Sequence, residues 1–133
     1  MIDEGRALFL QIAESVEDSI IDGTLPEEAQ APSTNELAAF YRINPATAAK
    51  GVNMLVDKGV LYKRRGIGMF VSPGARALLR AERRAAFADR FVEPLLAEAR
   101  TLGLEPDDLT ELIRERAARA ASAASISPEG AER

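Results

Sequence analysis

Residues 33–72 read STNELAAFYRINPATAAKGVNMLVDKGVLYKRRGIGMFVS, and this stretch decides the fold. It opens with Ser33-Thr34-Asn35-Glu36, a capping-box sequence whose hydroxyl and carboxylate satisfy free amides at a helix start. A short helix from there ends near Arg42. Asn44-Pro45 marks a second start, because asparagine suits the N-cap and proline the first helical position. The sequence therefore predicts two helices joined by a tight turn.

A short hairpin is expected after the second helix. Lys58-Gly59 provides a cation in the last turn and a glycine just beyond it, which is typical of a helix end. Val60–Lys63 and Met69–Ser72 favour strands, and the two glycines in residues 64–68 suit the connecting turn. The predicted order in this stretch is helix, turn, helix and β-hairpin.

Helices are expected on both sides. Residues 6–22 place apolar side chains on one stripe, which predicts an amphipathic helix before a loop at 24–32. Residues 75–103 form a second helical block with a kink expected near Arg90–Glu93, caused by Pro94. A last helix runs from Pro106 to about Arg119, and residues 121–133 are expected to be disordered. The fold class is mainly α with a small β-hairpin.

The 133 residues contain no cysteine and no histidine, which excludes thiol chemistry, disulfides and the usual zinc ligands. An enzyme is therefore the least expected class, and no cofactor or metal is expected. The N-terminus has no basic region followed by an apolar one, so no secretory signal is predicted. No apolar run is long enough to span a membrane. We expect a cytoplasmic protein.

Charge is divided unevenly along the chain, whose formal net charge is −4. Residues 1–32 hold eight acids and one base, whereas residues 33–72 hold two acids and six bases. The local field of a surface matters more to a polyanion than the total charge. The basic segment coincides with the turn, the second helix and the hairpin, in winged-helix order, and this coincidence favours nucleic-acid binding.

In a helix-turn-helix the second helix enters the major groove with its N-terminus first. Small or polar side chains there allow close approach and contact with bases, and helix N-terminal amides and basic hairpin residues suit phosphates. The residues predicted to bind DNA are Ser33, Thr34, Asn35, Asn44, Pro45, Ala46, Thr47, Lys50, Lys63, Arg64, Arg65, Gly66 and Gly68. Each feature also has a plainer explanation, because helical corners, solvated basic runs and glycine turns are common.

Residues 6–72 resemble the winged helix-turn-helix domain of the GntR family of bacterial repressors. The resemblance is carried by P-S-x-x-E-L-A (Pro32 to Ala38), I-N-P-x-T (Ile43 to Thr47) and R-x-G-x-G-x-F-V ending at Val71. Asn35 stands where many members have an arginine, and Glu27-Glu28 replaces a usual Pro-Gly. The short C-terminal part resembles the YtrA subfamily, whose two C-terminal helices chiefly dimerise and many of whose members repress operons for ABC transporters.

This resemblance implies a winged helix-turn-helix domain at residues 1–72, a helical dimerisation region at 73–120 and a tail at 121–133. We expect a homodimeric repressor that binds an inverted-repeat operator in double-stranded DNA. The residues predicted at the dimer interface are Phe87, Phe91, Leu95, Leu96 and Leu102, although some of them could pack on their own domain instead.

Other interpretations remain open at the sequence level. A winged helix can bind an acidic protein or structured RNA in place of duplex DNA. The sequence identifies no small-molecule effector, and the 61 residues after the hairpin leave little room for a ligand pocket of ~300 Å³ or more within one protomer. A ligand is therefore expected at the dimer interface or at the domain junction.

Overall fold

The computed structural model describes residues 6–132, and the side chains of residues 6–124. Residues 1–5 and residue 133, which include the start of the N-terminal segment and the end of the predicted tail, lie outside the described residues. Packing divides the chain into two compact units, Met1–Arg84 and Ala85–Arg133.

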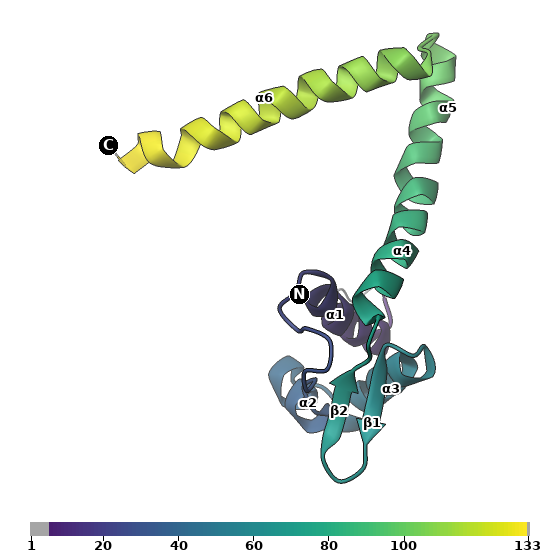
Figure 1. Cartoon of the computed structure of the whole chain (residues 1–133), viewed down its shortest axis with the longest axis vertical. Helices are drawn as coiled ribbons and strands as arrows, with labels where there is room; N and C mark the ends of the chain where they lie inside the picture. The colour runs from purple at the N-terminus through teal and green to yellow at the C-terminus, as the bar shows by residue number, and fades with distance from the viewer. Residues whose placement is uncertain (1–5, 133) are drawn as a thin grey trace. The chain divides into compact units, whose positions relative to one another are not determined.

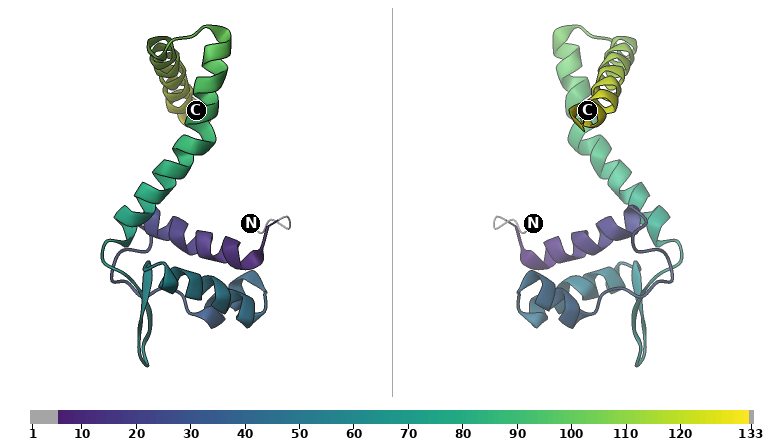
Figure 2. Two further views of the ribbon diagram at one scale, coloured as in Figure 1. Left: turned by 90° about the vertical axis from the view of Figure 1, so that its right-hand side faces the viewer. Right: turned by 90° about the vertical axis from the view of Figure 1, so that its left-hand side faces the viewer.

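The first unit has the predicted order of three helices followed by a hairpin. Figure 1 shows the hairpin projecting from the helical body, and Figure 2 shows α1 on the side of α2 and α3 away from the hairpin tip. The first unit contains α1 (Leu8–Ile21), α2 (Thr34–Tyr41), α3 (Pro45–Asp57), β1 (Leu61–Arg64), β2 (Gly68–Val71) and most of α4 (Ala75–Phe87).

The core of this unit forms where α1 crosses α3. Ile12 of α1 and Leu55 of α3 are almost completely buried, and Val60 and Val71 bring the hairpin into the same cluster. Gly51 allows the two helices to approach closely, because a Cβ atom there would lie 2.7 Å from the Phe9 carbonyl oxygen. The contact fixes α3 by its inner face and leaves its N-terminal turn exposed.

The first unit extends beyond residue 72, where the sequence analysis ends the domain. Ala75 and Leu79 of α4 are buried in its core. Arg76 Nε donates a hydrogen bond of 2.9 Å to the Ile21 carbonyl at the end of α1. The beginning of α4 therefore packs with the winged-helix core.

Ion pairs join α1, the end of α3 and α4. Lys58 Nζ lies 2.7 Å from Glu17 Oε2 and 2.6 Å from Glu82 Oε1. Arg83 lies 2.7 Å from Asp18. Burial opposes the positive charge of Lys58, but hydrogen bonds to the two glutamates outweigh it and raise the pKa of Lys58.

The second unit contains a π-helical segment η1 (Ala88–Val92), followed by α5 (Glu93–Leu102) and α6 (Pro106–Glu132). The irregularity expected near Arg90–Glu93 is a π-helical turn, in which the Glu93 amide donates to the Ala88 carbonyl. Pro94 has no amide hydrogen, which explains why the regular α-helical pattern changes here.

Helix α6 is longer than expected. It continues past Arg119 to Glu132, across the segment for which the sequence predicts a disordered tail from residue 121. Six of the eight residues from 117 to 124 are alanine. Alanine has the highest helix propensity, so a segment of small residues without hydrophobic periodicity is still compatible with a helix.

Candidate nucleic-acid interface

The N-terminus of α2 is held by the predicted capping box. Ser33 Oγ accepts a hydrogen bond of 3.0 Å from the Glu36 amide, and the Ser33 amide donates one of 2.8 Å to Glu36 Oε1. Ser33 and Asn35 are exposed and Thr34 is half-buried. The three residues predicted to contact DNA therefore lie at a preorganised helix start that is open to solvent.

The N-terminus of α3 is also capped as predicted. Asn44 Oδ1 accepts a hydrogen bond of 2.8 Å from the Ala46 amide, with Pro45 in the first turn. The cap occupies the carbonyl oxygen of this side chain, so its Nδ2 amide is left as the group that could donate to a base. Ala46 is exposed and Thr47 is half-buried.

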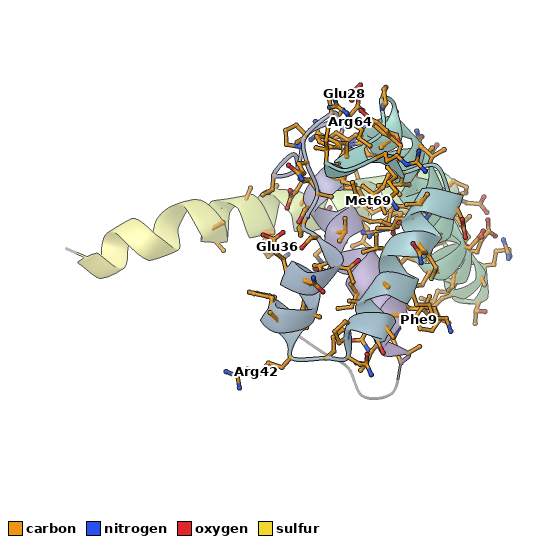
Figure 3. The ribbon with its side chains drawn as sticks, turned by 90° about the horizontal axis from the view of Figure 1, so that it is seen from below. Phe9, Glu28, Glu36, Arg42, Arg64 and Met69 are labelled. Carbon is orange, nitrogen blue, oxygen red and sulfur yellow. The ribbon has the colours of Figure 1, made fainter. Side chains whose placement is uncertain are left out.

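Lys50 lies one turn further along α3, and its Nζ is 4.0 Å from the centroid of the Phe9 ring. This cation–π contact holds the lysine without neutralising its charge. Arg42, in the turn before α3, is exposed at a φ of 58° and points away from the protein in Figure 3. The sequence analysis did not include Arg42 among the DNA-binding residues, although its basic side chain in the turn was a signal.

The hairpin is tighter than expected. Arg64 pairs with Gly68 at the end of the ladder, so three residues form the turn, and the Ile67 amide donates 2.9 Å to the Arg64 carbonyl. Gly66 has a φ of 75° and Gly68 a φ of 145°, conformations that favour glycine. The basic residues Lys63, Arg64 and Arg65 are all exposed around this turn.

A segment that the sequence analysis treats as loop supports the hairpin. The Ala31 amide donates 2.8 Å to the Met69 carbonyl, and the Val71 amide donates 3.0 Å to the Ala29 carbonyl. Gln30 Nε2 donates 3.1 Å to the Ile67 carbonyl in the turn itself. Three residues of Ala-Gln-Ala are too few to reveal a strand by alternation, which is why this support was missed.

Glu28 also lies beside the hairpin, at the same edge of the molecule as Arg64 (Figure 3). Its carboxylate accepts a hydrogen bond from the Tyr62 hydroxyl. This hydrogen bond raises the pKa of Tyr62. The Glu28 carboxylate is thus engaged by a neutral phenol, and no carboxylate of the described residues pairs with Arg64 or Arg65.

The basic side chains at the interface differ from those elsewhere in the first unit in whether an acidic side chain pairs with them. Among the described residues, no carboxylate forms an ion pair with Lys50, Lys63, Arg64 or Arg65, whereas Lys58, Arg83 and Arg6 all pair with acids of α1. Arg64 instead places its guanidinium 4.7 Å from the centroid of the Phe70 ring. The acidic residues of α1 are partly neutralised within the protein, and the bases of α3 and the hairpin stay available to an outside anion.

All thirteen residues predicted to bind DNA lie on three structural features of one compact unit, the starts of α2 and α3 and the hairpin. Within the described residues, no group of three or more acidic side chains is placed to hold a metal ion. No described helix is long and apolar enough to cross a membrane.

Comparisons with known proteins agree with this arrangement. A family model described as "Bacterial regulatory proteins, gntR family" matches residues 8–71. The HTH-type transcriptional repressor YtrA of Bacillus subtilis (strain 168) is 27% identical over 108 residues, which cover 81% of this chain and 82% of that protein. The HTH-type transcriptional repressor NagR of the same organism is 34% identical over 65 residues, but these cover only 27% of NagR.

Among solved structures, a putative GntR-family transcriptional regulator from Bacteroides thetaiotaomicron matches with a TM-score of 0.71 and 32% identity. The match covers 86% of this chain and 99% of that one, so it includes the C-terminal helices as well as the winged helix. These relatives are transcriptional regulators and not enzymes. The chain belongs to the GntR family of bacterial regulatory proteins and is a DNA-binding transcriptional regulator with a winged helix-turn-helix.

Proposed function

We propose that the protein is a homodimeric repressor that binds an inverted-repeat operator. The observation that carries this proposal is the set of exposed bases around the start of α3 and the hairpin, with which no carboxylate of the described residues forms an ion pair. Each base that neutralises a phosphate releases counterions, which makes binding both favourable and steeply dependent on salt. The similarity to the repressor YtrA supports repression as the outcome.

Two kinds of side chain form the interface, those that contact phosphates and those that contact bases. Lys63, Arg64 and Arg65 of the hairpin, together with Lys50 and Arg42, contact phosphates. The exposed methyl group of Ala46 and the side chain of Thr47 lie at the start of α3, where contacts with bases give sequence preference. Because these base-reading residues are small and uncharged, most of the affinity comes from the hairpin and most of the specificity from α3.

The second unit supplies the dimer contact. Of its described side chains, only Ala99 and Leu109 are buried. Phe87, Phe91, Leu95 and Leu102 are between 41% and 63% exposed, and the Phe87 and Phe91 ring centroids lie 5.4 Å apart. Leu96 of α5 is half-buried and lines the same hollow as Leu109 of α6. Exposed apolar surface of this kind is typical of a partner interface, and we assign it to a second copy of the chain.

A symmetric dimer presents two copies of α3 to two half-sites about one helical turn apart. We place the operator in the promoter of the operon that encodes the protein, and a transporter operon as the target follows from the resemblance to the YtrA subfamily. Binding to DNA places the protein in the cytoplasm.

Fluorescence anisotropy with a labelled duplex from that promoter tests the proposal. Scrambling one half-site is expected to weaken binding, because only one subunit of the dimer then contacts its half-site. Structured RNA or an acidic protein that displaces the duplex at equal concentration would favour one of the other uses of a winged helix. Equal affinity for the intact and scrambled duplexes would contradict sequence-specific repression.

A further inference from the structure

A hollow of about 680 Å³ opens on the first unit between α1, α2 and the segment from residue 25 to 32. Its volume lies within the range of small-molecule sites, about 300–1,000 Å³. None of the functions assigned above uses it. The sequence favours the dimer interface or the domain junction as the place for a ligand, if there is one, whereas this hollow lies within the winged-helix unit itself.

One wall of the hollow is apolar and unusually exposed. Phe40 of α2 has 78% of its surface open to solvent, and Leu25 and Pro32 face the same space. The Phe40 ring packs edge-on against Tyr41, with centroids 4.9 Å apart. A large aromatic ring left in water beside a hollow provides a surface on which a ligand can displace water.

The other wall is polar. At its inner side Ser15 Oγ and the Tyr41 hydroxyl share a hydrogen bond, so each satisfies the other. Glu36 Oε1 accepts from the Ser33 amide, and no bond among the described residues engages Oε2. Among the residues that line the hollow, Glu36 is the one that carries a charge. A positively charged group is therefore the partner that this wall favours.

The aromatic part of the lining favours the same sign of ligand charge. The faces of aromatic rings also attract cations, and Phe40 and Tyr41 present two such rings next to the carboxylate. An organic anion would meet repulsion from Glu36 and no cation of the lining to offset it.

We propose that this hollow binds a small organic cation. Its ammonium group contacts Glu36 Oε2, and its apolar or aromatic body packs against Phe40 and Leu25. The Ser15–Tyr41 hydrogen bond closes the inner wall and limits the length of the ligand.

A ligand at this position would also influence DNA binding, a step that rests on the proposed function. Glu36 lies in the first turn of α2 and fixes Ser33 through the capping box. A bound cation neutralises this carboxylate close to the residues that approach phosphates, and the ligand should therefore tighten DNA binding. Reciprocity requires DNA to tighten ligand binding by the same factor.

Isothermal titration calorimetry of the full chain, without DNA, tests the site. The probes are phenethylammonium, phenylacetate and 2-phenylethanol, which share a ring and differ in charge. Phenethylammonium should bind most tightly, and Glu36→Gln should weaken it about ten-fold. Glutamine also suits this position of a capping box, so α2 remains capped. Phe40→Ala should weaken binding several-fold.

Glu111→Gln, in α6, is the matched control and should leave the affinity unchanged. Equal affinity for the three probes would overturn the proposal, as would an absence of heat with protein that is folded by circular dichroism, or an unchanged affinity in Glu36→Gln. Because these titrations contain no DNA, their failure is separate from a failure to bind an operator. If phenethylammonium does not increase the affinity of the protein for its operator, the proposed coupling between ligand binding and DNA binding is overturned.

Discussion

Lys58 and Arg64 carry the same charge in opposite environments. Lys58 is held between the carboxylates of Glu17 and Glu82, whereas Arg64 lies over an aromatic ring with no carboxylate partner among the described residues. A paired cation stabilises the fold, and an unpaired one remains available to a phosphate. Residue type alone does not show whether a base stabilises the fold or binds a phosphate. The presence or absence of an acidic side chain beside it does.

The double variant Arg64→Ala/Arg65→Ala should bind DNA more weakly whatever the sequence. It should also reduce the slope of log K against log salt by about 1.8, because each lost phosphate contact contributes about 0.9. Anisotropy titrations at four salt concentrations measure this slope. Arg80→Ala/Arg84→Ala removes the same charge from α4 and serves as the control. Equal slopes in the two double variants would remove the hairpin from the interface.

Lys58→Ala should lower the free energy of unfolding by about 1–3 kcal/mol, because it leaves the buried Glu17 carboxylate without its closest partner. The control Lys63→Ala should change stability by less than about 0.5 kcal/mol and weaken DNA binding instead. Urea unfolding followed by circular dichroism measures both variants. Similar destabilisation by the two would contradict the distinction between paired and free lysines.

The pKa of Lys58 predicts how this difference depends on pH. Since the folded state raises the pKa above the ordinary value of 10.5, the ion pair contributes fully below that value. Its contribution is lost as the pH rises through the raised pKa. The stability difference between the wild type and Lys58→Ala should therefore be constant near neutral pH and shrink only in strongly alkaline solution.

At the scale of the elements, the contact between α1 and α3 positions the interface. Gly51 is a buried glycine inside α3, where glycine costs about 1 kcal/mol relative to alanine. The structure explains why it is there. A Cβ atom would approach the Phe9 carbonyl to 2.7 Å and the Ile12 Cβ to 3.3 Å.

Gly51→Ala should therefore destabilise the protein by about 1–3 kcal/mol, although alanine is the better helix former. The exposed neighbour Asn53→Ala is the control and should stabilise the protein by a few tenths of a kcal/mol through helix propensity alone. Thermal unfolding of both variants checks the two signs. A more stable Gly51→Ala protein would show that α1 and α3 are not in close contact.

The same elements show what the sequence could predict. The starts of α2 and α3 were predictable from the sequence, because their caps depend on local hydrogen bonds and backbone preferences. The residues concerned are Ser33, Glu36, Asn44 and Pro45. Hydrophobic periodicity identified α1 equally well. These features depend only on residues a few positions apart.

Contacts between distant residues could not be predicted in this way. The bond from Gln30 to Ile67 joins residues 37 positions apart, and the close approach at Gly51 depends on the path of α1. Packing of the first unit continues past Pro73-Gly74 through Leu79, because a turn signal in the sequence does not mark the end of a packed unit. The hollow beside Phe40 depends on three separate segments and has no local signature.

At the scale of the whole molecule, the two units differ in what they bury. The first has a continuous core from Ile12 to Leu79, whereas the second leaves most of its described large apolar side chains exposed. A helical unit of this size is not expected to be stable with so little buried surface, since small units need added support. Association with a second copy would supply that surface.

Phe87→Ser/Phe91→Ser should convert the dimer into a monomer, because it removes two exposed rings from the proposed contact. Sedimentation equilibrium measures the mass directly. Ile67→Ser, which removes an exposed apolar side chain from the hairpin tip, should remain dimeric. A double variant that keeps the dimeric mass would place the contact elsewhere.

We propose that the winged helix of this chain binds operator DNA through Lys50, Lys63, Arg64 and Arg65, which pair with no carboxylate of the described residues. A gel shift with the promoter of its own operon, repeated at several salt concentrations, is the decisive measurement. We expect a specific complex at low salt, and log K should fall steeply and linearly with log salt. No shift at low salt, with folded dimer present, would contradict it.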